Sequence, residues 1–280
     1  PLRAVRTART RSDPMPKNDR LILIPPSEGK ALGGEHDPWT TDPSDATAPL
    51  RESRLEVIAA LQEAMERARP EGLRKMFGVK GDALTRTVDA NSSLDDAPTL
   101  PAIERYDGVL YQHLDAPSLG KRARRTLDSQ VRILSGLWGF VTPSELIPDY
   151  RLKMSTSLPG LGKLSTWWLE VVTEAIVAER RPDCEVWNLL PQEHAAAWDP
   201  PTRTHELTAV FLQPGKDGAL KPVAHWNKAL KGSLVAHLVS NPAVEPGDLT
   251  EWEHPAGYLL DESSLTPAGD GPRQLRFVQH

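Results

Sequence analysis

The sequence predicts an α/β fold, a single compact domain in which helices surround a mixed sheet. Short apolar runs, typical of buried strands, alternate along the 280 residues with segments whose apolar side chains recur at helical spacing. The chain has no internal repeat and no clear linker, because its 26 prolines are scattered rather than gathered at one point. Its hydrophobic fraction of 39% and charged fraction of 25% are those of ordinary globular proteins.

Composition excludes several classes of protein. No apolar run reaches the roughly 18–20 residues that a membrane-spanning helix needs. The single cysteine, Cys184, excludes an internal disulfide and a multi-thiolate metal site, and it indicates a reduced, cytoplasmic protein. His194 and His205 have no metal-ligand spacing, so we expect no metal and no other cofactor.

Charge is distributed unevenly along the chain. Residues 1–20 carry six basic and two acidic side chains, whereas 27 basic and 36 acidic side chains make residues 21–280 acidic. We expect residues 1–19 to be a disordered extension or cloning remnant, with a basic nucleic-acid-binding arm as the alternative, and residues 20–280 to form the domain. Because an acidic body repels polyanions, any contact with nucleic acid needs a local basic patch.

The first predicted element is a strand at Leu21–Ile24, whose continuous apolar run suits burial on both faces of a sheet. Two prolines end it, because proline cannot donate a hydrogen bond to a sheet, and residues 31–50 are typical of a loop. Helical spacing of apolar residues then predicts helices. They span Arg51–Arg67, Glu71–Phe77, Asp82–Ala90 and Leu119–Ser129.

The second half continues the alternation. A buried strand at Val131–Ser135 precedes a helical turn at Pro143–Ile147, and Lys163–Arg180 has the most regular helical pattern of the chain. The amphipathic segment His225–Val239 predicts the last long helix. The remaining apolar runs predict strands at Glu185–Leu190, Thr208–Leu212, Ala219–Val223, Tyr258–Leu260 and Leu275–Val278.

A first candidate site directly follows the first strand. Ser27, Glu28 and Lys30 offer a hydroxyl, a carboxylate and an ammonium within four residues. Ligands bind beyond the carboxyl ends of strands in α/β sheets, so this cluster suits anion binding or acid–base chemistry. The alternative is a polar turn with a solvated lysine.

A second candidate follows Val131–Ser135. Tyr150, Arg151 and Lys153 place an aromatic ring and two cations within four residues, a combination that suits a nucleobase with its phosphate. The alternative is that Arg151 forms an ion pair with one of the many carboxylates.

A third candidate is the glycine-containing turn before Lys163–Arg180. Gly160, Gly162 and Lys163 resemble the hairpin of helix-hairpin-helix modules, in which glycine amides and a helix N-terminus hold one DNA phosphate. Because the preceding segment 151–157 is not convincingly helical, we predict only a partial helix-hairpin-helix-like element. A plain loop capped by a helix is the alternative.

Other polar residues lie in or beside apolar segments. Lys228 and Lys231 are three residues apart and so share one face of a helix, although in acidic surroundings a solvated face better explains either lysine taken alone. Tyr111, Asn188 and Asp107 are further candidates.

The ordered set of these segments resembles the YaaA family of peroxide stress resistance proteins over residues 21–265. The matching blocks are LILIPPSEGK at 21–30, YDGVLY at 106–111, RILSGLWGFVTPSELIPDYRLKM at 132–154, SLPGLGKLSTWW at 157–168, VWNLLPQEH at 186–194, HWNKALKGSLVAHLV at 225–239 and GYLLDESS at 257–264.

The resemblance implies a compact α/β fold with a positively charged cleft, and protection from oxidative damage through lowered free iron and DNA binding. It implies that Lys30 and the segment Tyr150–Leu152 match family positions, and that Lys228 and Lys231 match a basic helix face. The same scaffold also resembles that of enzymes that modify deazaguanine bases in DNA.

Three hypotheses follow, and the sequence favours the first by a small margin over the second. The first is a stress protein that binds DNA through a cleft lined by Lys30, Arg151, Lys153, Lys163, Lys228 and Lys231. The second is an enzyme acting on a nucleobase, nucleoside or nucleotide: Tyr150 or Tyr111 would orient the ring, Arg151 and Lys30 would hold an anionic group, and Glu28 or Asp107 would move protons. The third is an iron-handling or scaffold protein.

Overall fold

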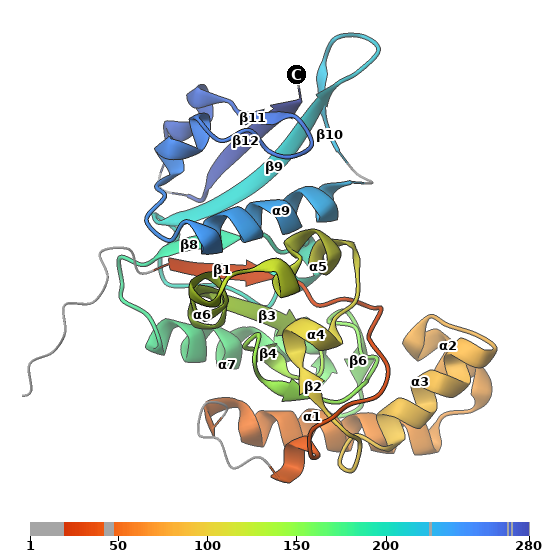
Figure 1. The fold of residues 1–280 in the computed structure, drawn as a ribbon. Helices are drawn as coiled ribbons and strands as arrows, with labels where there is room; N and C mark the ends of the chain where they lie inside the picture. Colours follow the sequence, from red (N-terminus) through yellow and green to blue (C-terminus); the bar gives the residue numbers. More distant parts are fainter. Residues whose placement is uncertain (1–19, 42–47, 224–225, 268, 270, 280) are drawn as a thin grey trace, which may run out of the picture.

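The computed structural model describes the chain except residues 1–19, 42–47, 224–225, 268, 270 and 280. Its centre is an eight-stranded mixed sheet in which five neighbouring strands run parallel, in the order β12-β9-β8-β1-β3 (Figure 1). These strands span Arg20–Ile24 (β1), Val131–Ser135 (β3), Glu185–Asn188 (β8), Glu206–Pro214 (β9) and Arg273–Gln279 (β12).

Antiparallel strands complete the sheet, and two small two-stranded pairs lie outside it. The sheet gains β4 (Gly139–Val141), β10 (Leu220–Pro222) and β11 (Tyr258–Leu260), and the small pairs are β2 (Leu100–Pro101) with β5 (Leu146–Ile147) and β6 (Ser157–Leu158) with β7 (Gly162–Lys163).

The helices form two groups. In one, α5 and α6 each pack against α9, and Figure 1 shows α6 and α9 in front of the sheet; in the other, α1 packs against α7. The helices span Ala48–Arg67 (α1), Pro70–Phe77 (α2), Asp82–Ser92 (α3), Ala102–Arg105 (α4), Val109–Leu114 (α5), Lys121–Gln130 (α6), Leu164–Ala178 (α7), Gln192–Ala195 (α8) and Asn227–Ser240 (α9).

The predicted α/β class is confirmed, and β1 shows why. Leu21 to Ile24 are all fully buried, although successive side chains of a strand point to opposite faces, so both faces of the sheet must be covered there. Most predicted elements lie within two or three residues of an observed one. The helical turn predicted at Pro143–Ile147 is wrong, because Leu146–Ile147 forms β5 and pairs with β2. No helix was predicted from the sequence at the position of α5.

The helix-hairpin-helix-like element is not confirmed. Its glycines do lie at a tight turn, where Gly160 and Gly162 have φ values of 79° and 72°. The segment before that turn is the strand β6 and not a helix, and β6 pairs with β7 in a two-stranded hairpin that leads into α7. Only one helix therefore adjoins the turn.

The topology identifies where a ligand crevice should lie. From β1 the chain proceeds to β3 on one side of it, and from β8 it proceeds to β9 on the other side. In open α/β sheets, ligands bind at the carboxyl ends of two such neighbouring strands, where the direction of winding reverses. For this chain that point is the edge at which β1 and β8 end.

The extension expected at residues 1–19 lies outside the described residues. Within the part of the chain that is described, no helix combines the length and apolar character needed to cross a membrane.

Gly232 in α9 is a close-contact point that a substitution can test. A methyl group there would overlap the backbone carbonyl of Leu110 on α5 and come within 3.0 Å of Cβ of His113. We expect Gly232→Ala to lower the free energy of unfolding by about 1–3 kcal/mol, as overpacking does, despite the better helix propensity of alanine. Urea titration measures the change.

Gly72 in α2 is the matched control for that substitution. A methyl group at Gly72 would make only an ordinary contact, 3.5 Å from Cβ of Ala68. We expect Gly72→Ala to be neutral or to stabilise by up to about 1 kcal/mol. Equal effects of the two substitutions would contradict the packing argument.

Candidate functional site

A polar cavity of about 490 Å³ lies beyond the carboxyl end of β1. Its wall combines the loop after β1, the segment before α5, helix α3 and the segment 149–151. The lining residues are Glu28, Gly29, Lys30, Asp82, Ala83, Arg86, Thr87, Ala90, Asp107, Asp149, Tyr150 and Arg151. Five of the predicted site residues therefore share one cavity, although they come from three distant parts of the sequence.

The loop after β1 is held closely against the segment before α5. The backbone amide of Asp107 donates to the carbonyl of Gly29 at 3.0 Å, and the Ser27 hydroxyl donates to the carbonyl of Asp107 at 3.2 Å. A side chain at Gly29 would overlap the Asp107 carbonyl, and one at Gly108 would overlap the Ser27 hydroxyl. The backbone contact at Gly29 therefore requires glycine, and a side chain at Gly108 would displace the Ser27 hydroxyl from the Asp107 carbonyl.

Lys30 lies at the inner side of the cavity. Its Nζ donates to the carbonyl of Ser27 at 3.0 Å and lies 4.3 Å from the ring centroid of Tyr150 and 5.6 Å from that of Tyr106. Burial lowers the pKa of Lys30 from 10.5 to about 7; the charge of Asp149 opposes this shift and that of Arg151 adds to it. A lysine in this state exchanges protons near neutral pH.

A chain of buried hydroxyl groups stands beside Lys30. The Tyr150 hydroxyl lies 2.7 Å from Ser135 Oγ and 2.6 Å from the Tyr106 hydroxyl. Ser135 Oγ accepts hydrogen bonds from the backbone amides of Leu137 and Trp138, so its own hydrogen must be donated to Tyr150. Between Tyr150 and Tyr106, either hydroxyl can be the donor. Burial raises the pKa of Tyr150 to about 12, so the chain is neutral at physiological pH.

Glu28 pairs with two cations at the mouth of the cavity. Arg151 Nη2 lies 2.6 Å from one carboxylate oxygen and Lys153 Nζ lies 3.1 Å from the other. Burial acts to raise the pKa of Glu28, but the hydrogen bonds and charges of Lys153 and Arg151 outweigh it and the pKa is lowered. Asn91 of α3 fixes the Arg151 backbone, because its side chain donates to the carbonyl and accepts from the amide, both at 2.9 Å.

Several residues of the site were not predicted. Arg86 of α3 donates to Asp149 at 3.1 Å and to the carbonyl of Lys30 at 3.4 Å. Arg105, fully buried, donates to three carbonyls, one of them that of Ala31, and so connects the loops around the cavity. Asp149 stands beside the predicted Tyr150, so proximity in sequence could have indicated it; Arg86 and Arg105 carry no comparable signal.

Other predicted residues lie elsewhere. Tyr111 is buried and its hydroxyl donates to the carbonyl of Pro25 at 2.8 Å, so it does not line the cavity and offers no ring face to a ligand. Tyr150 lines the cavity but is only 3% exposed, which also leaves little of its ring for stacking. Gly160, Gly162 and Lys163 are exposed on the β6–β7 hairpin.

The two lysines of α9 lie outside the cavity. Lys231 Nζ donates to the carbonyl of Leu189, which follows β8, and burial lowers its pKa to about 8. Burial lowers the pKa of His194 to about 4, and the charge of Lys228 contributes to that shift. These groups therefore lie near the carboxyl end of β8, the second strand of the predicted crevice.

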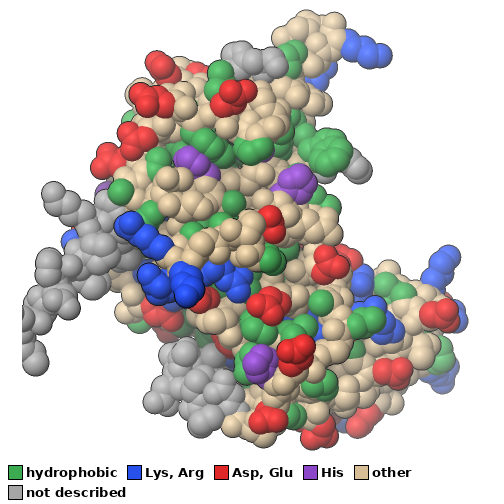
Figure 2. Space-filling view, in the orientation of Figure 1, with side chains coloured by type: hydrophobic (Ala, Val, Ile, Leu, Met, Phe, Trp, Pro, Cys, Tyr) green, Lys and Arg blue, Asp and Glu red, His purple; other side chains and the backbone are tan. Residues whose placement is uncertain are grey.

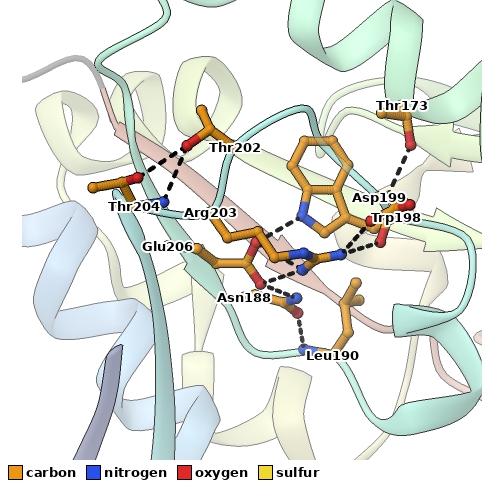
Figure 3. Close-up of polar contacts among 9 residues, drawn as sticks. All are labelled: Thr173, Asn188, Leu190, Trp198, Asp199, Thr202, Arg203, Thr204 and Glu206. Atoms are coloured by element: carbon orange, nitrogen blue, oxygen red, sulfur yellow. Dashed lines mark hydrogen bonds and ion pairs between the residues drawn. The ribbon is translucent and has the colours of Figure 1, made fainter. Parts of the chain in front are cut away.

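Asn188 belongs to a buried polar cluster around Glu206 (Figure 3). Its amide donates to Glu206 at 2.8 Å, while its carbonyl oxygen accepts from the amide of Leu190 at 3.2 Å. Glu206 also accepts from the indole of Trp198 and, with both oxygens, from Arg203 at 2.9 Å. These contacts occupy the side chain of Asn188, whose role in the structure is to hold β8, β9 and the following loop together.

The Glu206 cluster supports a stability prediction. We expect Glu206→Gln to destabilise the protein by about 3 kcal/mol. The change leaves Arg203 without its buried carboxylate partner, and the new amide N–H group would face the N–H donors that now bind Glu206. Chemical denaturation measures the loss. Glu174→Gln on the exposed side of α7 is the control and should change stability by less than about 0.5 kcal/mol; a similarly small effect at Glu206 would contradict the prediction.

The cavity brings together groups for acid–base chemistry and for anion binding. It contains an amine that titrates near pH 7, three further carboxylates beside Glu28 and the guanidinium groups of Arg86 and Arg151. Among the described residues, no three His, Cys, Asp or Glu side chains are grouped so that they could hold a metal ion.

Comparisons with known proteins find relatives that match this chain over most of its length. A UPF0246 protein of Streptomyces coelicolor is 35% identical over 265 residues, which cover 93% of this chain and 98% of that protein. One from Corynebacterium glutamicum is 32% identical over 251 residues (87% and 95%), and one from Flavobacterium johnsoniae 28% over 247 residues (86% and 94%). The sequence profile described as peroxide stress protein YaaA matches residues 21–264. The chain belongs to this family, the peroxide stress protein YaaA family.

Proposed function

We propose that this member of the YaaA family is an enzyme that binds a nucleobase, nucleoside or nucleotide in the Lys30 cavity, with Lys30 as the group that carries a proton. The observation that carries the proposal is the position of Lys30 Nζ, in the wall of a polar cavity, over Tyr150 and among carboxylates. Perturbed amines in such clefts are typical of catalytic sites.

The ligand class follows from the shape and charge of the cavity. Its volume of about 490 Å³ lies in the range of small-molecule sites, and it stands at the carboxyl end of β1, where α/β proteins bind nucleotides. Arg86 and Arg151 would hold an anionic group, and Asp107 and Glu28 would accept hydrogen bonds from base N–H groups.

A thermal-shift panel of nucleobases, nucleosides and nucleotides tests the proposal. A ligand present at about 100 times its Kd stabilises the folded protein by roughly 2.7 kcal/mol, a shift in Tm of several degrees or less in a chain of this size. We expect Lys30→Met to weaken ligand binding, with an apparent Kd at least tenfold higher than that of the parent protein. Lys163→Met, at an exposed lysine outside the cavity, should leave the apparent Kd unchanged. No shift with any compound would contradict the proposal.

DNA binding is a second candidate function. The surface that supports it is not the cleft predicted from the sequence. In the cleft, Arg151 and Lys153 are paired with Glu28, and Arg86 with Asp149. Helix α6 instead presents Lys121, Arg122 and Arg125, all exposed and without an ion pair among the described residues. Figure 2 shows the resulting cluster of basic side chains at the position of α6.

Salt dependence tests this second candidate. Each cation that neutralises a phosphate contributes about 0.9 to the slope of log K against log salt concentration. We expect a variant with Lys121, Arg122 and Arg125 all changed to glutamine to lose about 2–3 from the slope that the parent protein shows with duplex DNA. An unchanged slope, or no binding by the parent at low salt, would contradict it.

A further inference from the structure

Lys30 has no carboxylate within ion-pair distance among the described residues, although the side chain is half-buried. Among the described residues, its Nζ contacts one hydrogen-bond acceptor, the carbonyl of Ser27, and the faces of two tyrosine rings. A buried ammonium is ordinarily paired with a carboxylate, because desolvation of an unpaired charge is costly. An amine without such a partner is free to react as a nucleophile.

We propose that Lys30 Nζ forms an imine with the aldehyde of a sugar phosphate bound in this cavity. The inference deepens the proposed function, since it assigns a covalent role to the same lysine and narrows the ligand to one that carries both a carbonyl carbon and a phosphate. The aldehyde could belong to a free pentose phosphate or to an abasic nucleotide within a DNA strand, because both present the same chemistry.

The step balances with groups that line the cavity. The amine lone pair of Lys30 attacks the aldehyde carbon and the C=O π electrons move to oxygen. A carboxylate takes one proton from the new ammonium nitrogen and a proton is delivered to the oxygen, which gives a neutral carbinolamine. A carboxyl group then protonates the hydroxyl, which leaves as water as the C=N bond forms. Asp107 lines the same cavity, carries no ion pair among the described residues and can exchange these protons with solvent. The lowered pKa of Lys30 supports the first step, because about half of the amine is neutral at pH 7.

Two guanidinium groups in the wall can hold the phosphate. Arg151 uses Nη2 for Glu28 and Nε for the carbonyl of Phe77, and Arg86 uses Nη2 for Asp149 and the carbonyl of Lys30. Within the described part of the chain, Nη1 of each arginine has no protein acceptor, so each retains donors for a phosphate oxygen. Lys30 and both arginines line one cavity, which places an anion site and the amine within reach of one small ligand.

Reductive trapping tests the inference on the full chain. The protein is incubated at pH 7 with 2-deoxyribose 5-phosphate and cyanoborohydride, and in a second arm with a single-stranded oligonucleotide containing one abasic site. Hydride reduces the imine to a stable secondary amine, which peptide mass spectrometry locates. We expect one adduct on Lys30, at least tenfold above that on any other lysine, in at least one arm.

Two variants keep the test specific. Lys30→Arg retains the positive charge but cannot form an imine and should lose the adduct; Lys163→Met, at an exposed lysine, should retain it. Melting curves establish that both variants are folded, and Lys30→Met replaces Lys30→Arg if the arginine variant is not. Adducts spread evenly over surface lysines, or absent from both arms, overturn the inference. An adduct from the sugar phosphate alone assigns a free metabolite, and one from the oligonucleotide alone assigns DNA.

The outcome separates this inference from the proposed function. If nucleotides shift the Tm in a Lys30-dependent way while no adduct forms, the imine is wrong and the acid–base role stands. If the adduct forms at Lys30 while no member of the panel binds, the ligand class of the proposed function is wrong and the imine stands.

Discussion

Trp168→Ala is expected to lower the free energy of unfolding by about 3–5 kcal/mol, the largest stability loss that we predict for a single substitution. Trp168, on α7, is fully buried, and its indole donates to the carbonyl of Gly136 at 2.9 Å. It packs so closely on the turn after β3 that a side chain at Gly139 would lie 2.9 Å from its ring. The substitution opens a cavity and leaves a buried carbonyl without its donor.

The neighbouring Trp167 provides the control for Trp168. It is only half-buried, and its indole nitrogen has no hydrogen-bond partner among the described residues. Trp167→Ala should therefore cost clearly less than Trp168→Ala in guanidinium titrations with equal m-values. Equal losses of stability for the two substitutions would show that the contacts of Trp168 with Gly136 and Gly139 do not stabilise the fold.

The second large effect is the pH dependence that Lys30 imposes on stability. Its pKa is lowered in the folded protein from 10.5 to about 7, so between pH 7 and 10.5 the unfolded chain binds a proton that the folded chain does not. The stability of the parent protein relative to Lys30→Met should accordingly rise with pH over that window, by at most about 1.4 kcal/mol per pH unit.

Urea titrations of the two proteins at pH 7, 8 and 9 measure this difference. We expect Lys30→Met to be the more stable protein at pH 7, because it removes the cost of burying an amine, and the gap to narrow as the pH rises. The comparison also cancels the contribution of Lys231, whose pKa is lowered to about 8 and which both proteins retain. A gap independent of pH between 7 and 9 would show that Lys30 has an ordinary pKa.

The hydroxyl chain of Ser135, Tyr150 and Tyr106 helps to explain why the pKa of Lys30 is lowered. Tyr150 and Tyr106 present their ring faces to the ammonium, which favours a cation, but they also shield one side of it from water. Burial is the stronger effect, and the pKa falls. The three hydroxyl groups hydrogen-bond to one another and to the amides of Leu137 and Trp138, so this chain holds the two tyrosines in place and offers Lys30 no charged partner.

The amino-acid sequence by itself determined most of the elements. Leu21–Ile24 and Val131–Ser135 are continuous apolar runs, and such runs form strands only where both faces of a sheet are covered. The helix at Leu164–Ala178 follows from apolar residues that recur at helical spacing. The quoted sequence blocks likewise indicated the family. Where local signals were short, prediction failed: six residues at Val109–Leu114 show no clear period, and Leu146–Ile147 is a strand only because Leu100–Pro101 pairs with it.

Only the tertiary structure decided which polar groups act together. Lys30, Asp107 and Arg151 lie more than forty residues apart in sequence, so their assembly around one cavity depends on strand order and on the close contacts of Gly29 and Gly108. The same packing paired Lys153 with Glu28 and placed Tyr111 and Asn188 in structural hydrogen bonds. The physical reason is that ion pairing and burial determine whether a side chain is charged and what it can contact. Both depend on contacts between segments far apart in the sequence, which a local sequence pattern cannot predict.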